Sequence, residues 1–493
     1  MRSYIFKLAL LAVAVVSIAG CEKKLNDWEV DPSYQRLFRS LIFESSKIGA
    51  TDVEIRYTQT VSADKYIFEF SKDSLQFGEI VKTVEIDADT LTPFAPSTSP
   101  TRVEFRTTFG ELDGNSPYSV RMKGVNTATG DESKYAEFFF RTTTEQLFSK
   151  SESYLNRLVL YWLPTDRVTH ISLFSPVTGQ ELKKADLSSS DKQAGRFEIT
   201  DLEPGTSYRV AIYNGEISRG ALTLKTSGLE GGTVIPVNPG DDIADLVATA
   251  IAGGKSDIII MFSGSQPYDL GVLTLPAGLH DVSLTGEPDV NGNNPTLSIR
   301  ELKVTGPSYG KVLFENLNVT AASGSGHFIN LGGDGLEFTG YVFINCYIAN
   351  FGSSVVRISN NSIKAGGIIF DKCLIHKIGG WGVVNVGGTN VILDSISFTN
   401  STLTDLATQL MDVRAEVGKI VIGSCTFYNE NAAMTQLLRF NSGTLPLSLV
   451  TYDNIFAGSN SGGKINAVSY DYAKFGLQVS FAGSYLTNEM QIE

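Results

Sequence analysis

Short runs of alternating apolar and polar residues follow one another from about residue 36 to residue 227. The first group includes DVEIRYTQT from Asp52 and KYIFEFS from Lys65, and the second includes LNRLVLYWL from Leu155 and SYRVAIYNG from Ser207. A period of two with turn residues between the runs predicts antiparallel β-strands. Each group has roughly the length of a β-sandwich, about 100 residues. We therefore expect two sandwich domains, over residues 36–143 and 144–227.

One stretch in the second group has a more specific pattern. In LEPGTSYRVAIY, which starts at Leu202, Tyr208 enters an alternating strand four residues after a proline. This pattern resembles the tyrosine corner of fibronectin type III domains, in which the hydroxyl bonds upstream backbone. GELDGNSPYSVRMKGV, with Tyr118, is a looser copy. The resemblance implies two fibronectin type III-like domains that act as spacers, and we expect Trp162 in the core rather than on a binding surface.

A different periodicity governs the C-terminal half. Similar six-residue phrases recur at steps of 29, 27, 23, 29 and 29 residues: FENLNV from Phe314, FINCYI from Phe343, FDKCLI from Phe370, LDSISF from Leu393, IGSCTF from Ile422 and TYDNIF from Thr451. Self-similarity at such a period predicts stacked coils. We expect residues 241–493 to form a right-handed parallel β-helix, so that the chain as a whole is all-β.

Three positions recur in each phrase. The last two are two residues apart and face one side of a strand, whereas the first lies three residues earlier and can share that interior only across a bend. The middle position holds Cys346, Cys373 and Cys425. We expect free thiols that pack as small hydrophobic groups, with a disulfide as the alternative that an exported protein allows.

The segment before the repeats predicts a linker and a cap. Residues 228–240 are rich in glycine and proline and are assigned to a linker. DDIADLVATAIAGG follows, in which Asp241 can cap a helix and Gly253 can end it. The apolar face of this helix, with Ile243, Leu246, Val247, Ala250 and Ile251, is expected to cover the open end of the β-helix.

A second column of the coils carries the candidate binding residues. Its outward positions are assigned to Asn330, Arg357, Asn385, Arg414 and Arg439, and these include three of the four arginines found after residue 234. One interpretation is a solvated face whose arginines pair with Asp412 or Glu416. The other is a groove for an extended anionic polymer, because arginine binds carboxylates in a bidentate manner. Trp381, Tyr347 and Tyr341 could stack on sugar faces.

The N-terminus predicts export. Arg2 and Lys7 precede an apolar stretch that ends in IAGC at Cys21, which resembles a bacterial lipobox. The resemblance implies a signal peptide over residues 1–20, lipidated Cys21 and a tether to residue 35; the alternative is an ordinary signal peptide with a chance cysteine. The net charge is −13, and −13 − 2 = −15 after removal of Arg2 and Lys7. This balance argues against nucleic acid as a partner.

The whole layout resembles Bacteroidota surface lipoproteins with fibronectin-like domains followed by two adjoining domain families of unknown function, together a pectate-lyase-like solenoid. The resemblance implies a lipid-anchored protein of the outer membrane, exposed at the cell surface, that captures polysaccharide, several relatives being linked to pectin. A glycan transporter would be a neighbour. The membrane would be contacted through the lipid only.

Two other function classes stay open. A lyase of this fold would use clustered carboxylates for calcium and an arginine or lysine as base, but few carboxylates accompany the arginines, so we assign no catalytic residue. The four histidines, His170, His280, His327 and His376, lie far apart in the sequence and show no metal-binding spacing. No cofactor is therefore expected, with calcium implied only for a lyase. An adhesin is the third class.

Overall fold

The computed structural model describes residues 36–94, 102–264, 266–359, 362–388, 390–430, 434–440, 448–458, 465–468 and 481–486. The chain forms two compact units. One unit comprises Met1–Gln146 with Asn214–Gly220, and the other comprises Leu147–Tyr213 with Ala221–Glu493. Cys21 and the tether lie outside the described residues.

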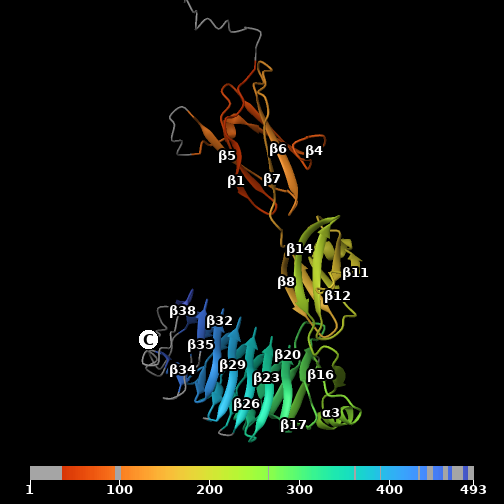
Figure 1. Ribbon diagram of the computed structural model, residues 1–493, viewed down its shortest axis with the longest axis vertical. Coiled ribbons are helices and arrows are strands. Elements are labelled where there is room, and N and C mark those ends of the chain that lie inside the picture. Colours follow the sequence, from red (N-terminus) through yellow and green to blue (C-terminus); the bar gives the residue numbers. More distant parts are fainter. Residues whose placement is uncertain are drawn as a thin grey trace, which may run out of the picture. The chain divides into compact units, whose positions relative to one another are not determined.

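The first unit contains a sandwich of two antiparallel sheets, as the alternation predicts (Figure 1). Its three-stranded sheet has the order β1-β2-β5 and its four-stranded sheet the order β4-β3-β6-β7. The strands are β1 Phe43–Ile48, β2 Val53–Thr58, β3 Lys65–Ser71, β4 Ile80–Asp87, β5 Glu104–Phe109, β6 Pro117–Val125 and β7 Ala136–Arg141, with a short 3-10 helix at Ala88–Thr90. The backbone N–H of Asp113 donates to the Tyr118 hydroxyl at 3.0 Å, which confirms the looser tyrosine corner.

The second sandwich repeats this design. A three-stranded sheet, β12-β9-β8, faces a four-stranded sheet, β11-β10-β13-β14. The elements are β8 Phe148–Ser153, β9 Leu158–Trp162, β10 His170–Phe174, β11 Glu181–Asp186, α2 Ser189–Ala194, β12 Arg196–Ile199, β13 Ser207–Asn214 and β14 Ile217–Lys225. The Tyr208 hydroxyl accepts from the backbone N–H of Glu203 at 3.1 Å, and Trp162 is buried. Both predictions for this domain are confirmed.

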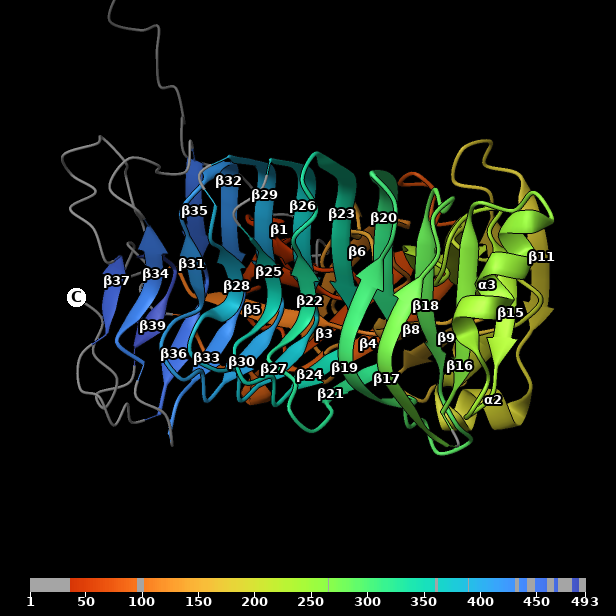
Figure 2. The same cartoon turned by 90° about the horizontal axis from the view of Figure 1, so that it is seen from below.

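The C-terminal region is a parallel β-solenoid of about eight turns (Figure 2). One ten-stranded sheet is built from β15 Thr233–Val237, β16 Ile258–Ser263, β18 Val282–Glu287, β20 Ser308–Glu315, β23 Leu336–Ile344, β26 Ile363–Asp371, β29 Val391–Thr399, β32 Glu416–Gly423, β35 Ser448–Tyr452 and β38 Phe481–Ala482. β15 falls inside the predicted linker, so that assignment was wrong for Thr233–Val237. Pro236 is tolerated there because β15 is the edge strand of its sheet.

The other sheet has two branches that meet at β19 Thr296–Val304, which also pairs with β17 Pro267–Leu275. One branch holds β21 Asn318–Ala321, β24 Tyr347–Ala349, β27 Leu374–His376, β30 Thr402–Thr404, β33 Thr426–Tyr428, β36 Ile455–Ala457 and β39 Tyr485–Leu486. The other holds β22 His327–Leu331, β25 Ser354–Ile358, β28 Gly382–Val386, β31 Met411–Val413, β34 Gln436–Phe440 and β37 Asn466–Val468. Every strand pair in this region is parallel.

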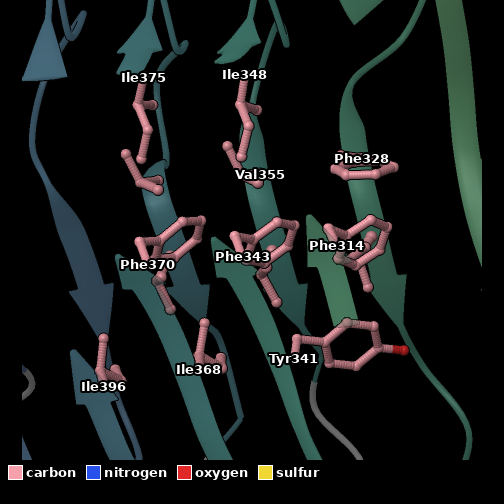
Figure 3. Close-up of a cluster of buried hydrophobic side chains, with 14 of the residues drawn as sticks. Phe314, Phe328, Tyr341, Phe343, Ile348, Val355, Ile368, Phe370, Ile375 and Ile396 are labelled. Atoms are coloured by element: carbon pink, nitrogen blue, oxygen red, sulfur yellow. The ribbon is translucent and has the colours of Figure 1, made fainter. Parts of the chain in front are cut away.

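Like residues stack over like in the solenoid interior. Phe314, Phe343 and Phe370 lie face to face with ring centroids 4.6 Å apart (Figure 3). Phe398 continues the stack at 4.8 Å. The predicted alignment placed Leu393 in this column and was wrong for that coil. β29 buries Val391 and Leu393 in its first half and Ile396 and Phe398 in its second half, so the pattern allows two alignments. The aromatic stack selects Phe398 over Leu393.

The bend inferred within each phrase is a residue in the left-handed conformation. Its φ lies between 53° and 56° in six successive coils, at Asn316, Asn345, Lys372, Asn400, Ser424 and Asp453. Asparagine is among the residues that tolerate this conformation best. The bend turns the chain between two sheets, so that Phe343 and Cys346, three residues apart, are both buried.

The three cysteines of the solenoid are free and buried. Burial raises the pKa of the Cys425 thiol to about 11, and it raises the pKa of the Cys346 thiol well above its ordinary value. In the fourth coil Ser401 occupies the equivalent place, and its hydroxyl accepts from the Cys373 amide at 3.0 Å. The thiols therefore fill the interior, as predicted.

Helix α3, Ile243–Ala252, packs at the first coils, beside β15 and β17 (Figure 2). Ile243 and Val247 are buried against the solenoid core, whereas Leu246 is exposed. The helix ends at Gly253 as predicted, but its N-cap is Asp242 rather than Asp241. The Asp242 carboxylate accepts from the Asp245 amide at 3.1 Å.

The second sandwich and the solenoid share a buried junction. Leu155 and Leu229 pack against Ile259 and Leu313, which lie on β16 and β20. The Glu315 carboxylate accepts from the Gly228 amide at 2.5 Å. The start of the predicted linker, at Gly228 and Leu229, is therefore packed against the solenoid.

Candidate functional site

The predicted column of polar residues follows one branch of the solenoid sheet, and we call it the polar strip. Asn385 was predicted to face out but is buried. The strand register places its members on successive rungs: Asn330 on β22, Arg357 on β25, Asn385 on β28, Asp412 on β31 and Arg439 on β34. Neighbouring rungs lie about 4.8 Å apart. The strip therefore follows the solenoid axis, which is the geometry that an extended chain requires.

The structure corrects one member of this row. Asn385 pairs with Asp412, not with Arg414. In MDVRA the apolar residues alternate with both polar residues, so the pattern alone did not decide which of the two aligns with Asn385. Arg414 lies two residues beyond Asp412, a spacing that returns a strand to the same face, and its side chain pairs with Asp412.

Asp412 is the anion around which the strip is organised. Its carboxylate is completely buried. The Arg414 guanidinium binds it with two hydrogen bonds, Nε to Oδ1 at 3.3 Å and Nη2 to Oδ2 at 2.9 Å, and Arg439 Nη1 lies 3.6 Å from Oδ2. The hydrogen bond from Arg414 to Asp412 raises the pKa of the guanidinium. Two of the three arginines are thus held by one buried carboxylate, as the solvated-face interpretation expected.

Arg357 is held differently. Its Nη1 donates to the Asn330 side-chain oxygen at 3.1 Å, and no carboxylate lies within ion-pair distance among the described residues. Arg357 therefore keeps its full charge available on the strip. The burial of His327 and, to a smaller extent, the charge of Arg357 lower the pKa of His327. The Nδ1 atom of His327 lies 2.6 Å from the Ser354 hydroxyl.

Sequence reasoning missed a further cation, Lys303. Leu302 on β19 pairs with Ile329, so Lys303 stands one rung before Asn330, and it is exposed. Its Nζ lies 3.4 Å from Glu301. The sequence pattern did not reveal Lys303 because β19 runs through both branches of the sheet. With Lys303, four cations face two carboxylates, Glu301 and Asp412, which leaves the strip at +2 on an acidic protein.

The aromatic candidates separate clearly. Trp381 precedes β28 and is 44% exposed, and its ring centroid lies 5.7 Å from the guanidinium carbon of Arg414. Tyr341 is buried, with its hydroxyl 2.8 Å from that of Tyr309, so it cannot stack on a ligand. Tyr347 is half-buried on the other branch of the sheet. Only Trp381 of these three joins an exposed ring to the polar strip.

The histidines are less isolated than the sequence indicated. His280 Nδ1 lies 2.7 Å from Asp257, which the neighbouring coil brings beside it, and 3.9 Å from Asp281, the next residue in the chain. The hydrogen bond to Asp257 raises the pKa of His280. Among the described residues this trio has the ligand atoms and spacing to hold a metal ion. It lies just before β16 and β18, away from the polar strip.

Comparisons with known proteins bear on the fold only. No family model matches the chain, and no curated protein matches it. The chain is similar to a two fibronectin type III domain segment from chicken tenascin, at 17% identity over 38% of this chain and 98% of that one, with a TM-score of 0.24. It is also similar to the FN1–FN3 domains of chicken CNTN1, at 15% identity over 42% of this chain and 70% of that one, with a TM-score of 0.18.

These likenesses are low, so the assignment rests on the sheets and corner hydrogen bonds described above. The chain is an all-β protein with two fibronectin type III-like sandwiches and a parallel β-solenoid. No helix among the described residues is long and apolar enough to cross a membrane.

Proposed function

We propose that this protein is a lipid-anchored cell-surface lipoprotein that binds polysaccharide, and that the polar strip holds a uronate-containing glycan such as pectin. In this proposal Cys21 carries the lipid in the outer membrane, the two sandwiches act as spacers and the solenoid presents the strip. A glycan transporter of the outer membrane would receive what the strip retains.

The observation that carries the proposal is the arrangement of Arg414, Trp381 and Asp412. Asp412 holds Arg414 through two hydrogen bonds, and Arg414 lies beside the exposed ring of Trp381. Because Asp412 already holds the Arg414 guanidinium in place, this side chain loses little conformational entropy when it binds a carboxylate of a ligand. A tryptophan ring next to it offers an apolar face to a sugar, so one site has groups for both parts of a uronate.

Arg357 and Arg439 extend the site along the solenoid axis. Arg357 lies two rungs from Asp412 and Arg439 one rung on the other side. Cations at several rungs match a polymer that carries repeated carboxylates better than a single small anion. The strip bears no group that we assign to bond cleavage, and the proposal is retention of the polymer without a change in its length.

Native affinity electrophoresis tests this function. Residues 22–493 would be run through gels cast with polygalacturonate, with rhamnogalacturonan or with a neutral glycan, next to an Arg357→Ala, Arg439→Ala double variant. We expect retardation in an acidic gel only, lost in the double variant. Arg300→Ala is the matched control, because Arg300 is the one other arginine after residue 234 and does not belong to the polar strip. Unchanged migration in every gel would contradict the proposal.

A further inference from the structure

A hollow at one end of the N-terminal sandwich combines exposed apolar side chains with positive charge. It has a volume of about 640 Å³ and is formed where β1 and β5 begin and β2 ends. Phe38, Leu41 and Val61 line it and are 87%, 86% and 73% exposed. Large apolar side chains exposed together in this way mark an interaction surface more often than single exposed ones do.

The charge of the hollow is opposite to that of its domain. Its twelve lining residues include Arg36, Arg39, Arg102 and Lys134 and no carboxylate. Residues 36–146 as a whole carry 13 Lys and Arg against 17 Asp and Glu. Arg102 pairs with Glu104 at 2.8 Å, whereas Arg39 and Lys134 form no ion pair with the residues that the structure describes. The surface is therefore cationic and apolar at once.

The position of the hollow along the chain limits its partner. Arg36 is separated from Cys21 by 14 residues, 22–35. A fully extended chain of that length spans at most about 50 Å. If Cys21 is lipidated, this end of the sandwich stays within that distance of the bilayer, and a second weak contact becomes effectively intramolecular.

We infer that the hollow around Phe38, Leu41 and Val61 is a membrane-contact surface, which sets the first sandwich against anionic lipid head groups. The apolar side chains enter the boundary between head groups and acyl chains, and Arg39 and Lys134 bind the phosphates. A surface that is both basic and apolar adds a second membrane contact to the lipid anchor. The inference rests on the lipid anchor of the proposed function, but not on glycan binding.

Vesicle co-sedimentation of an unlipidated chain tests the inference. Residues 21–493 with Cys21→Ser would be mixed with two kinds of vesicle, one of phosphatidylcholine alone and one that also contains about 30% phosphatidylglycerol, an anionic lipid. We expect binding to the anionic vesicles only, weakened by salt. An Arg39→Glu, Lys134→Glu variant should bind roughly 30-fold more weakly, because each basic residue near an anionic membrane raises the affinity about fivefold or more. A Phe38→Ser, Leu41→Ser variant should bind about tenfold more weakly.

Leu163→Ser, Val177→Ser is the matched control, because these two residues of the second sandwich are 75% and 92% exposed. Unaltered far-ultraviolet circular dichroism would show that each variant is folded. Absence of binding to anionic vesicles, or equal binding by the hollow variants and the control, would overturn the inference.

The chain's own acidic segment, DWEVD at residues 27–31, is the competing occupant. We expect deletion of residues 22–35 to leave vesicle binding unchanged. A gain of binding on deletion would mean that this segment fills the hollow and would also overturn the inference. Failure here leaves glycan retention untouched, whereas failure of the anchor would appear separately as absence of palmitate labelling at Cys21.

Discussion

Glu315 carries the sharpest prediction, because it is a carboxyl group buried at the junction of the second sandwich and the solenoid. It is 8% exposed, and its carboxylate accepts from the Gly228 amide at 2.5 Å. Burial raises its pKa to about 7, and the Gly228 hydrogen bond and the charges of Lys225 and Lys311 offset only part of that effect. Above neutral pH the folded protein must therefore hold a buried charge.

The sign and size of the effect follow from linkage. A raised folded-state pKa means that the folded chain binds this proton more tightly than the unfolded chain. The resulting stabilisation is complete below the ordinary value of 4.5 and is lost as pH rises through about 7. At about 1.4 kcal/mol per pH unit, the loss is on the order of 3 kcal/mol between pH 4.5 and pH 8.

Glu315→Gln removes the titration and keeps an acceptor for the Gly228 amide. The free energy of unfolding of the variant, minus that of the natural protein, should rise by about 3 kcal/mol when the pH is raised from 4.5 to 8. Urea unfolding at both pH values, followed by fluorescence, measures this, because Trp162 and Trp381 both lie in the second unit. The comparison cancels the pH dependence of every other group.

Glu337→Gln is the control, because Glu337 is an exposed side chain on β23 that pairs with Lys364 at 3.0 Å. It should change stability little at either pH. An equal difference between Glu315→Gln and the natural protein at pH 4.5 and at pH 8 would refute the reasoning.

Three further predictions concern the scaffold. Phe343→Ala empties the middle of the phenylalanine stack and should cost about 3–5 kcal/mol in urea unfolding; a cost below about 1 kcal/mol would show that the stack is not close-packed. Tyr208→Phe removes the corner hydrogen bond to the Glu203 amide and should cost about 1 kcal/mol by the same assay; no loss would contradict that role. Ellman's reagent should find no reactive solenoid thiol until urea unfolds the chain, because the sulfurs are buried and the pKa of Cys425 is raised to about 11; rapid reaction of the folded protein would contradict the free, buried thiols.

Features with a local cause could be predicted from the sequence. Alternation predicted both sandwiches, because a sheet with one buried face imposes a period of two on each strand. The tyrosine corners were recognisable because Tyr118 and Tyr208 bond backbone only five residues upstream. The bend between Phe343 and Cys346 could be predicted because two residues three positions apart point to opposite faces of a straight strand, so both can be buried in one interior only across a bend.

Features that depend on register or on contacts between coils could not be predicted. Leu393 and Phe398 both suit the interior, and only the ring stack in the neighbouring coil distinguishes them. Asp412 and Arg414 share one face of the strand, so their order in the polar strip depended on the pairing of β28 with β31. The approach of His280 to Asp257 joins residues 23 positions apart, which no linear motif reveals.

Calorimetric titration of the unlipidated chain with polygalacturonate tests the central claim most directly. Arg357→Ala should weaken binding by about tenfold or more, because a charge-assisted hydrogen bond contributes about 1.5–3 kcal/mol. Arg300→Ala, which removes the same charge from the same solenoid outside the polar strip, should leave the affinity nearly unchanged. Equal affinities for the two variants, or no heat of binding for the natural protein, would contradict a glycan site on the polar strip.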